Sequence, residues 1–294
     1  MKDYLLIEKK IINVLKEHKV VVYQNESYVV KKVAKPRPSK GECKTDVYIL
    51  LEGEKGKRIE IKLSVKKKNS SEFLENKITQ KRAKTIFGEK YQEIIEITTS
   101  LIKNKFVESP LIYTKRTGNV EEGSVTMGWR FEVVNKERKL SIPLQMSEKD
   151  IINCFYKGTN LEEDKRNAKV EGNIIINSGV ASHIIVCNEE DIKDYTDVLS
   201  NMISLDVYKP EKLYLAFISN NYRTKKDKID GSRALAVYVE WQLINGELTY
   251  NLVFNNPLTY TGRYLTTKLK QDLNKSKLDL DHIKLSNKVL KVTI

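Results

Sequence analysis

The stretch that decides the fold runs from Asp46 to Val65 and reads DVYILLE, then GEKG at 53–56, then KRIEIKLSV. Side chains on a β-strand alternate between two faces. The apolar residues of the second run therefore share one face: Ile59, Ile61, Leu63 and Val65. The polar residues share the other: Glu60, Lys62 and Ser64. This alternation predicts a β-hairpin with one core-facing side and one charged side.

A turn centred on residues 54–55 would place Asp46 opposite Leu63 and within a residue or two of Lys62. Two carboxylates, Asp46 and Glu60, and the Lys62 amine would then converge at one end of the hairpin. Mg²⁺ prefers oxygen ligands and lowers the pKa of a bound water. A neighbouring lysine can orient or deprotonate that water and offset charge in the transition state. The hairpin therefore predicts a Mg²⁺ site that hydrolyses phosphodiester bonds.

The competing interpretation is an exposed hairpin face with an incidental ion pair, worth about 0.2–1 kcal/mol. Glu-x-Lys triplets also begin at Glu8, Glu17, Glu75 and Glu163, so the triplet alone is not specific. The triplet at Glu60 differs because it lies on a predicted strand whose other face is continuously apolar. An acid also begins the neighbouring strand. These three features together favour the catalytic interpretation.

The formal charge of this 294-residue chain is +13, and the excess is uneven. Residues 1–120 contain 27 Lys and Arg against 15 Asp and Glu, whereas the remaining residues contain 25 against 24. A basic surface attracts polyanions. An AT-rich genome also enriches lysine, but that bias alone would not concentrate the excess in one part of the chain. The charge therefore favours a nucleic-acid partner for the part that contains the hairpin.

Composition also bears on location. A hydrophobic content of 40% and a charged content of 31% are typical of soluble globular proteins. No apolar run reaches the length of a bilayer span. The N-terminal apolar run is interrupted by Glu8, Lys9 and Lys10, unlike a signal peptide. The three cysteines are widely spaced and form no zinc pattern, which suggests reduced thiols. We therefore expect a cytoplasmic protein with no membrane partner.

The pattern along the first 120 residues predicts the order α-β-β-β-α-β, a compact mixed layer structure. An amphipathic helix is expected over 3–18 and a strand–turn–strand over 20–34, before the hairpin. Ser70 or Ser71 is expected to cap a helix that runs to Phe87 and ends at Gly88. A further helical stretch over 89–104 and a strand over 111–114 would complete this part.

Residues 121–294 are richer in strand patterns. The runs 125–134 and 139–145 predict one hairpin, and Asn245-Gly246 between two alternating runs predicts another. Ser147 and Asn188 are candidate caps for two helices, the second ending near Met202. Trp129 and Trp241 lie in strand-like runs and are expected in the core. With no linker-like segment, the two parts are expected to form one continuous body.

The order of helix, strands, Asp46, thirteen intervening residues and Glu60-Ile-Lys62 resembles the PD-(D/E)XK nuclease superfamily. The strings GECKTD (41–46), IEIKLSVKKKN (59–69) and FLENKI (73–78), with GWRFE (128–132) and RNA…NSGVA (166–181), resemble a type II restriction endonuclease. One departure is that Thr45, not proline, precedes the acid. The resemblance covers residues 1 to about 115.

This resemblance implies an α/β fold. A restriction-endonuclease-like α-β-β-β-α-β core, a mixed sheet flanked by helices, would occupy 1–120, with a β-rich DNA-recognition extension over 121–294. By position, Asp46 and Glu60 would be metal ligands and Lys62 the catalytic lysine. Some members add an acid from the first helix, for which Glu8 is the candidate and Glu17 an equal alternative. Glu42 is a third nearby acid, expected at the surface of a loop.

Basic residues outside the triplet are candidate DNA contacts. Those that flank the hairpin suit phosphate contacts: Lys40, Lys44, Lys66, Lys67 and Lys68. Two polar loops, 220–228 together with Arg233, and 255–263, could read bases, through Arg223, Lys225, Lys226, Arg233 and Arg263. The alternative for each is a solvated surface charge.

The resemblance and the charge together predict a Mg²⁺-dependent, sequence-specific endonuclease that cuts double-stranded DNA. It would act as a homodimer, because cutting both strands usually requires two active sites, and would be paired with a protective DNA methyltransferase. Two alternatives remain: a structure-specific repair or junction nuclease, and a non-catalytic DNA-binding protein on a degenerate nuclease fold.

Overall fold

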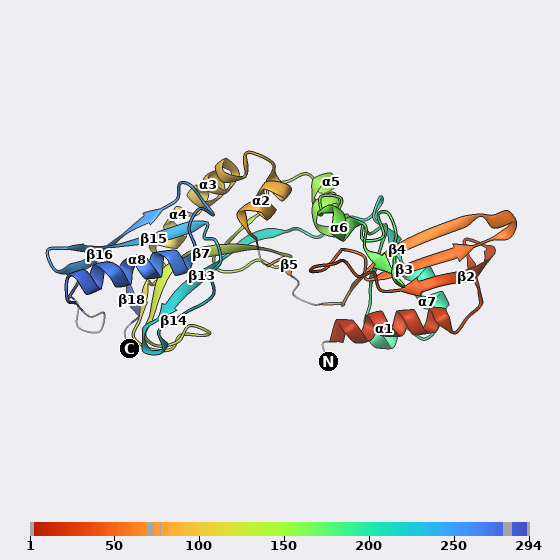
Figure 1. Ribbon diagram of the computed structural model, residues 1–294, viewed down its shortest axis with the longest axis horizontal. Helices are drawn as coiled ribbons and strands as arrows, with labels where there is room; N and C mark the ends of the chain where they lie inside the picture. Colours follow the sequence, from red (N-terminus) through yellow and green to blue (C-terminus); the bar gives the residue numbers. More distant parts are fainter. Residues whose placement is uncertain (1–2, 70–72, 77, 279–283, 293–294) are drawn as a thin grey trace. The chain divides into compact units, whose positions relative to one another are not determined.

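The computed structural model describes residues 3–69, 73–76, 78–278 and 284–292 and divides the chain into two compact units (Figure 1). Unit 1 comprises Met1–Ser71 and Gln145–Glu211, and unit 2 comprises Glu72–Leu144 and Lys212–Ile294. This division does not coincide with the expected boundary at residue 120. The physical reason is strand pairing, which joins segments that are distant in sequence in both units.

The division into two units also changes which part of the chain carries the surplus of positive charge. Unit 1 contains 25 Lys and Arg against 22 Asp and Glu, and unit 2 contains 27 against 17. The acidic segment Gln145–Glu211 offsets most of the basic excess of the hairpin segment. The surplus therefore lies mainly in unit 2, contrary to the expectation that it accompanies the hairpin.

A six-stranded mixed sheet forms the centre of unit 1. Its strands, in spatial order, are β1 (Val20–Tyr23), β2 (Glu26–Ala34), β3 (Val47–Glu52), β4 (Arg58–Lys66), β11 (His183–Val186) and β12 (Ile203–Ser204). Neighbours are antiparallel except β4 and β11, which run parallel. Between β4 and β11 this unit contains α5 (Glu148–Ile151), a π-helical turn (Ile152–Lys157), α6 (Glu163–Arg166) and the small ribbon β9 (Lys169–Val170) and β10 (Asn173–Ile174).

The core of unit 1 lies between the sheet and two helices, α1 (Asp3–Lys16) and α7 (Tyr195–Asn201). The apolar stripe of α1, including Ile7 and Ile11, packs with Val198 and Leu199 of α7 over one face of the sheet. That face carries the predicted core residues of the hairpin, Ile59, Ile61, Leu63 and Val65. The predicted division of the hairpin into a core face and a charged face is confirmed.

The turn of this hairpin is longer by one residue than expected. Glu52 pairs with Arg58, so the turn contains Gly53–Lys57 and the 3₁₀ segment Glu54–Gly56. Lys55 adopts a left-handed conformation with φ 55°. The added residue pairs Val47, rather than Asp46, with Leu63. Continuing the register therefore places Asp46 beside Ser64 and on the same face as Lys62.

The segment after the hairpin departs from expectation. Ser70 and Ser71 lie outside the described residues, and the chain then forms β5 (Phe73–Glu75) and a shorter helix, α2 (Gln80–Phe87). Thr79 caps α2 by accepting a hydrogen bond from the Arg82 amide, and the helix ends at Gly88 as predicted. With α3 (Tyr91–Leu101), α4 (Lys103–Val107) and β6 (Ile112–Tyr113), this segment belongs to unit 2. It does not extend the sheet that contains the hairpin, because β11 occupies the free edge of β4.

Unit 2 is built on a second mixed sheet. Its main strands are β7 (Ser124–Val134), β13 (Tyr214–Arg223), β14 (Lys228–Ile229), β15 (Val237–Ile244), β16 (Glu247–Val253) and β17 (Lys284–Leu285), with β8 (Ser141–Pro143) and β18 (Lys291–Val292) at its margins. The runs 125–134 and 139–145 were expected to pair as a hairpin, and this expectation was wrong. Each of them pairs instead with β13. The predicted turn at Asn245-Gly246 is confirmed. Helix α8 (Gly262–Lys275) packs against this sheet, and Trp129 and Trp241 are buried as expected.

Candidate active site

Asp46 lies immediately before the start of β3, beside the last residues of β4 and at the end of the hairpin opposite its turn. Its backbone amide donates to the Leu63 carbonyl at 2.8 Å. Its carboxylate Oδ2 accepts a hydrogen bond from the Val65 amide at 2.8 Å, and the Ser64 hydroxyl lies 3.5 Å from the same oxygen. Burial raises the pKa of Asp46 to about 6, although the charge of Lys66 and the Val65 hydrogen bond oppose this shift. Asp46 is therefore a carboxyl group that can change protonation state near neutral pH.

Glu8 of α1 is the second carboxylate of this site. Its side chain is 7% exposed, and its Oε2 accepts from the Lys35 amine at 2.5 Å. The negative charge of Glu8 contributes to the raised pKa of Asp46, which places the two groups in one electrostatic neighbourhood. The alternative helix acid, Glu17, is exposed and lies beyond the end of α1. Of the two candidates on this helical segment, the structure brings only Glu8 to Asp46.

Two lysines accompany these carboxylates. Burial alone would lower the pKa of Lys35, but the hydrogen bond and charge of Glu8, with the charges of Asp46 and Glu42, raise it overall. Lys66, at the end of β4, lowers the pKa of Asp46 through its charge. Two acids and two amines from α1, the segment after β2, the start of β3 and the end of β4 thus interact at one edge of the sheet.

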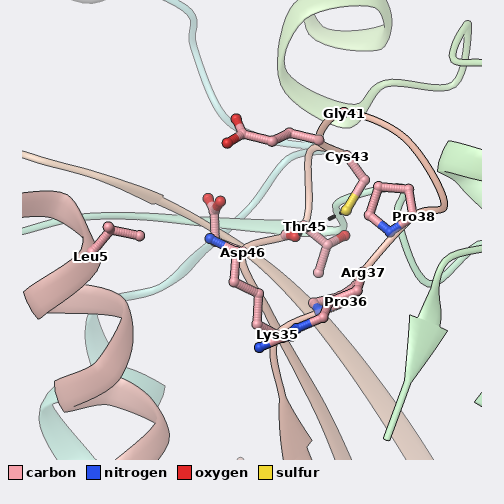
Figure 2. A pocket seen from close by; sticks show the side chains of 10 residues that line it. Leu5, Lys35, Pro36, Arg37, Pro38, Gly41, Cys43, Thr45 and Asp46 are labelled. Atoms are coloured by element: carbon pink, nitrogen blue, oxygen red, sulfur yellow. Dashed lines mark hydrogen bonds between the residues drawn. The ribbon is translucent and has the colours of Figure 1, made fainter. Parts of the chain in front are cut away.

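A pocket of about 380 Å³ opens beside Asp46. Figure 2 shows Leu5 of α1 on one side of it and Pro38 and Cys43 on the other, with Asp46 and Lys35 between them. The Cys43 thiol donates to the Thr45 carbonyl at 3.3 Å, and burial raises its pKa to about 11. The thiol therefore stays protonated at neutral pH and is a poor nucleophile.

The structure does not bring Glu60 to Asp46. Glu60 is exposed, pairs across the hairpin with Leu50, and accepts a hydrogen bond from the Tyr48 hydroxyl at 2.7 Å. Burial and the bond to Glu60 raise the pKa of Tyr48. Glu60 precedes Ser64, the neighbour of Asp46, by four strand residues, or about 13 Å. The expectation that Asp46 and Glu60 ligate one ion is corrected by this register.

Lys62 lies between these two ends of the hairpin. It is half-buried, pairs with Tyr48, and its backbone amide donates to the Ser182 hydroxyl at 3.0 Å. Ser64-Val65-Lys66, rather than Glu60-Ile61-Lys62, stands beside Asp46. From the sequence, Lys66 was expected only to contact phosphate, and Lys35 had no predicted role. The shared face of Lys62, Ser64 and Lys66 was visible in the alternation, but the length of the turn was not.

A Mg²⁺ site requires suitably placed oxygen ligands. Among the described residues, no group of three or more His, Cys, Asp and Glu side chains is placed to hold a metal ion. Mg²⁺ is, however, commonly bound by one or two carboxylates, with water and substrate phosphate completing its shell. Asp46 and Glu8, whose charges interact, offer two carboxylates for such a site, whereas Glu60 lies about 13 Å along the strand from the neighbour of Asp46.

The other basic residues near the hairpin differ in their surroundings. Lys40 is exposed in the loop that follows β2, and Lys44 is half-buried against Gly158. Lys67 is half-buried, and Lys68 is exposed and forms an ion pair with Asp191 at 2.8 Å. Of these lysines, Lys66 is the one whose charge is seen to lower the pKa of Asp46.

Most of the basic residues expected to read bases already have acidic partners within unit 2. Arg223 pairs with Glu121 at 2.7 Å and Asp230 at 2.5 Å. Lys225 pairs with Glu122 at 2.5 Å and Lys226 with Glu121 at 2.7 Å. Arg233 donates to the Asn76 carbonyl at 2.9 Å and lies 3.6 Å from Glu132, whereas Arg263 is exposed at the start of α8. Partners of this kind would compete with DNA for Arg223, Lys225 and Lys226.

Comparison with known proteins found no protein-family model, curated protein or solved structure that matches this chain. Each helix within the described ranges is too short or too polar to traverse a bilayer.

Proposed function

We propose that the chain is a Mg²⁺-dependent endonuclease that hydrolyses phosphodiester bonds of double-stranded DNA. The observation that carries the proposal is the electrostatic coupling of Asp46 to Glu8, Lys35 and Lys66, together with an open pocket that Asp46 and Lys35 line. Two carboxylates suit a hard cation, and two amines suit a phosphate. Purely structural ion clusters also perturb pKa values, and the pocket lined by Asp46 and Lys35 distinguishes this cluster from them.

The order of elements in unit 1 supports a restriction-endonuclease-like core. Helix α1 is followed by β1 and the antiparallel strands β2, β3 and β4, then by α5, α6, the small ribbon and the parallel strand β11. Apart from β1 and the ribbon, this order is compatible with the α-β-β-β-α-β order that the resemblance implies, with Glu72–Leu144 inserted after β4. In this proposal Ser64-x-Lys66 takes the position of the motif's acid-x-lysine triplet, and Glu8 supplies the second acid.

In the proposed site Asp46 and Glu8 would hold the metal ion. Mg²⁺, when bound there, would lower the pKa of a water molecule and neutralise charge on the scissile phosphate. Asp46 must be deprotonated for this role, and the opposing charge of Lys66 favours its deprotonated form. Lys66 would offset the negative charge that develops on the phosphate oxygens, and Lys35 orients the Glu8 carboxylate through their 2.5 Å contact.

Further parts of the proposal concern recognition. Unit 2 carries the larger basic surplus and would supply base contacts, as in a type II restriction endonuclease that is paired with a DNA methyltransferase. A homodimer would supply the second active site needed to cut both strands.

The direct test is to incubate the purified full chain with Mg²⁺ and a set of plasmids, beside an Asp46→Asn variant. Wild-type protein should yield discrete fragments, and sequencing of their ends should give one recurring site. Asp46→Asn should retain DNA binding in a metal-free buffer and yield no fragments. Absence of Mg²⁺-dependent cutting across many different DNAs would contradict the proposal.

A second candidate is a non-catalytic DNA-binding protein on the same fold. Two observations favour it. Ser64 supplies a hydroxyl where the motif usually has an acid, and the Glu8 carboxylate already pairs with Lys35. Metal-independent DNA binding with no nicking of any substrate would support this alternative over the nuclease.

A further inference from the structure

Three arginines of unit 2 surround one buried carboxylate. Glu132 of β7 has a side chain that is 4% exposed, and its Oε1 contacts Arg130, two residues before it on the same face of the strand. Arg233 lies 3.6 Å from the same oxygen. Arg138 lies 3.7 Å from the other oxygen, Oε2. Residues from β7, the segment after it, and the segment before β15 thus meet at one carboxylate.

This cluster has more positive than negative charge. Arg130 and Arg233 both approach Oε1, and Glu132 is the acid among the described residues with which either forms an ion pair. One carboxylate therefore faces two guanidinium groups even before Arg138 is considered. Burial and the neighbouring charge of Arg130 both lower the pKa of Arg233. A further anion near these groups would relieve their mutual repulsion.

The arginines remain accessible although the acid is buried. Their side chains are 19%, 33% and 34% exposed for Arg130, Arg138 and Arg233 respectively. Oε2 of Glu132 is buried and lacks a hydrogen-bond donor in the described part of the chain. A cluster that served only to satisfy a buried acid would be expected to satisfy both oxygens. Here the acid is instead surrounded by arginine side chains that are each partly exposed.

We propose that Arg130, Arg138 and Arg233 form a phosphate-binding site for the backbone of duplex DNA. The identity of the ligand rests on the proposed function, whereas the anion chemistry rests on the cluster alone. Planar guanidinium groups bind phosphate oxygens in pairs, and contacts of this kind fix the register of a duplex without reading its sequence. Glu132 is the positioning residue, because its buried carboxylate holds Arg130 and Arg233 in place.

The test compares Arg233→Gln with Lys115→Gln in the full chain. Lys115 is an exposed residue of the same unit, so its substitution makes the same change in net charge outside the cluster. Affinity for a duplex is measured in metal-free buffer at several salt concentrations, and the thermal midpoint is measured with and without inorganic phosphate. Arg233→Gln should bind DNA about tenfold more weakly, its salt slope should fall by about one, and its stabilisation by phosphate should decrease. Lys115→Gln should match the wild type in all three.

Two further variants keep the test decisive. Arg233→Lys preserves the charge but not the planar fork, and should recover the salt slope better than the affinity. If Arg233→Gln does not fold, Arg138→Gln takes its place, because Arg138 is one-third exposed and contacts the other oxygen of Glu132.

The outcomes separate this inference from the nuclease proposal. A protein that cuts DNA, but whose cluster variants bind it with the wild-type slope and respond normally to phosphate, would overturn the phosphate site alone. A wild-type protein that binds DNA and phosphate through the cluster, yet never cuts, would contradict the nuclease proposal and support the site.

Discussion

Strand β4 carries two triplets that end in lysine, and their surroundings differ sharply. Glu60-Ile61-Lys62 has the composition of a nuclease motif, but its acid is exposed and bonded to Tyr48. Ser64-Val65-Lys66 lacks the acid, yet it lies beside Asp46, a carboxyl whose pKa burial raises to about 6. The comparison teaches that a match in residue spacing is not a match in position. One residue in a turn decides which triplet an opposing acid meets.

The largest expected contrast is between the acids. Asp46→Asn should reduce Mg²⁺-dependent cleavage by about 10²–10³-fold, because it removes charge from the proposed metal site. Glu60→Gln should change cleavage by less than about threefold, since its carboxylate bonds to Tyr48 instead. Single-turnover cleavage of a plasmid measures both. A greater loss in Glu60→Gln than in Asp46→Asn would reverse the assignment of the two triplets.

The lysines give the next contrast. Lys66→Gln should slow cleavage by about 10²-fold, because it removes a cation coupled to Asp46. Lys62→Gln carries the same loss of charge on the same face of the strand and serves as the matched control. It should retain most of the activity. Equal losses in the two variants would indicate that strand charge, and not position beside Asp46, controls the rate.

In the metal-free protein, the unfolding free energy of the wild type should depend on pH differently from that of Asp46→Asn. Burial raises its pKa from 3.8 to about 6, so the folded state holds the proton more tightly than the unfolded state does. The resulting stabilisation is present below about pH 4 and is lost as the pH rises through about 6. Relative to Asp46→Asn, the wild type should therefore lose about 2 kcal/mol of unfolding free energy between pH 4 and pH 7.5.

Urea unfolding in the presence of a chelator at each pH measures this difference. Lys62→Gln leaves Asp46 in place and should follow the wild-type curve. Parallel curves for wild type and Asp46→Asn would contradict the raised pKa.

The smallest expected effect on cleavage is that of a substitution at Tyr48, the hydrogen-bond partner of Glu60. Tyr48→Phe removes the hydroxyl that donates to Glu60 and keeps the buried ring. It should lower the unfolding free energy by about 1 kcal/mol, the usual value of one hydrogen bond. Cleavage should be unchanged, because this bond lies away from Asp46. A large loss of cleavage at constant stability would assign the Tyr48–Glu60 pair a role in the reaction.

Local patterns predicted local structure well. The alternation of Ile59, Ile61 and Leu63 identified the core face, and Asn245-Gly246 identified a hairpin, because each signal depends on neighbours in the sequence. The helix assigned from Ser70 was wrong for the described residues that follow, since β5 pairs with β7 and Thr79 is the cap. Tertiary pairing outweighed the local capping signal there.

The site was predicted in part. Asp46 and the helix acid Glu8 were identified as candidates, and the structure brings them together. Lys35 and Lys66 were not identified as their partners, because this required the exact turn length and the course of the chain after β2. The partner of β4 was missed for a related reason. β11 is distant in sequence, and no local pattern specifies such a pairing.

The pairing of β4 with β11 also has a consequence for synthesis. Lys62 of β4 bonds to Ser182, a partner 120 residues further along the chain. While the ribosome makes the intervening residues, β4 of the nascent chain has one edge without its native partner, and such edges favour association between chains. Slower elongation or a chaperone deficit should therefore reduce the yield of soluble full-length protein. The thermal midpoint of the folded molecule would not reveal this sensitivity.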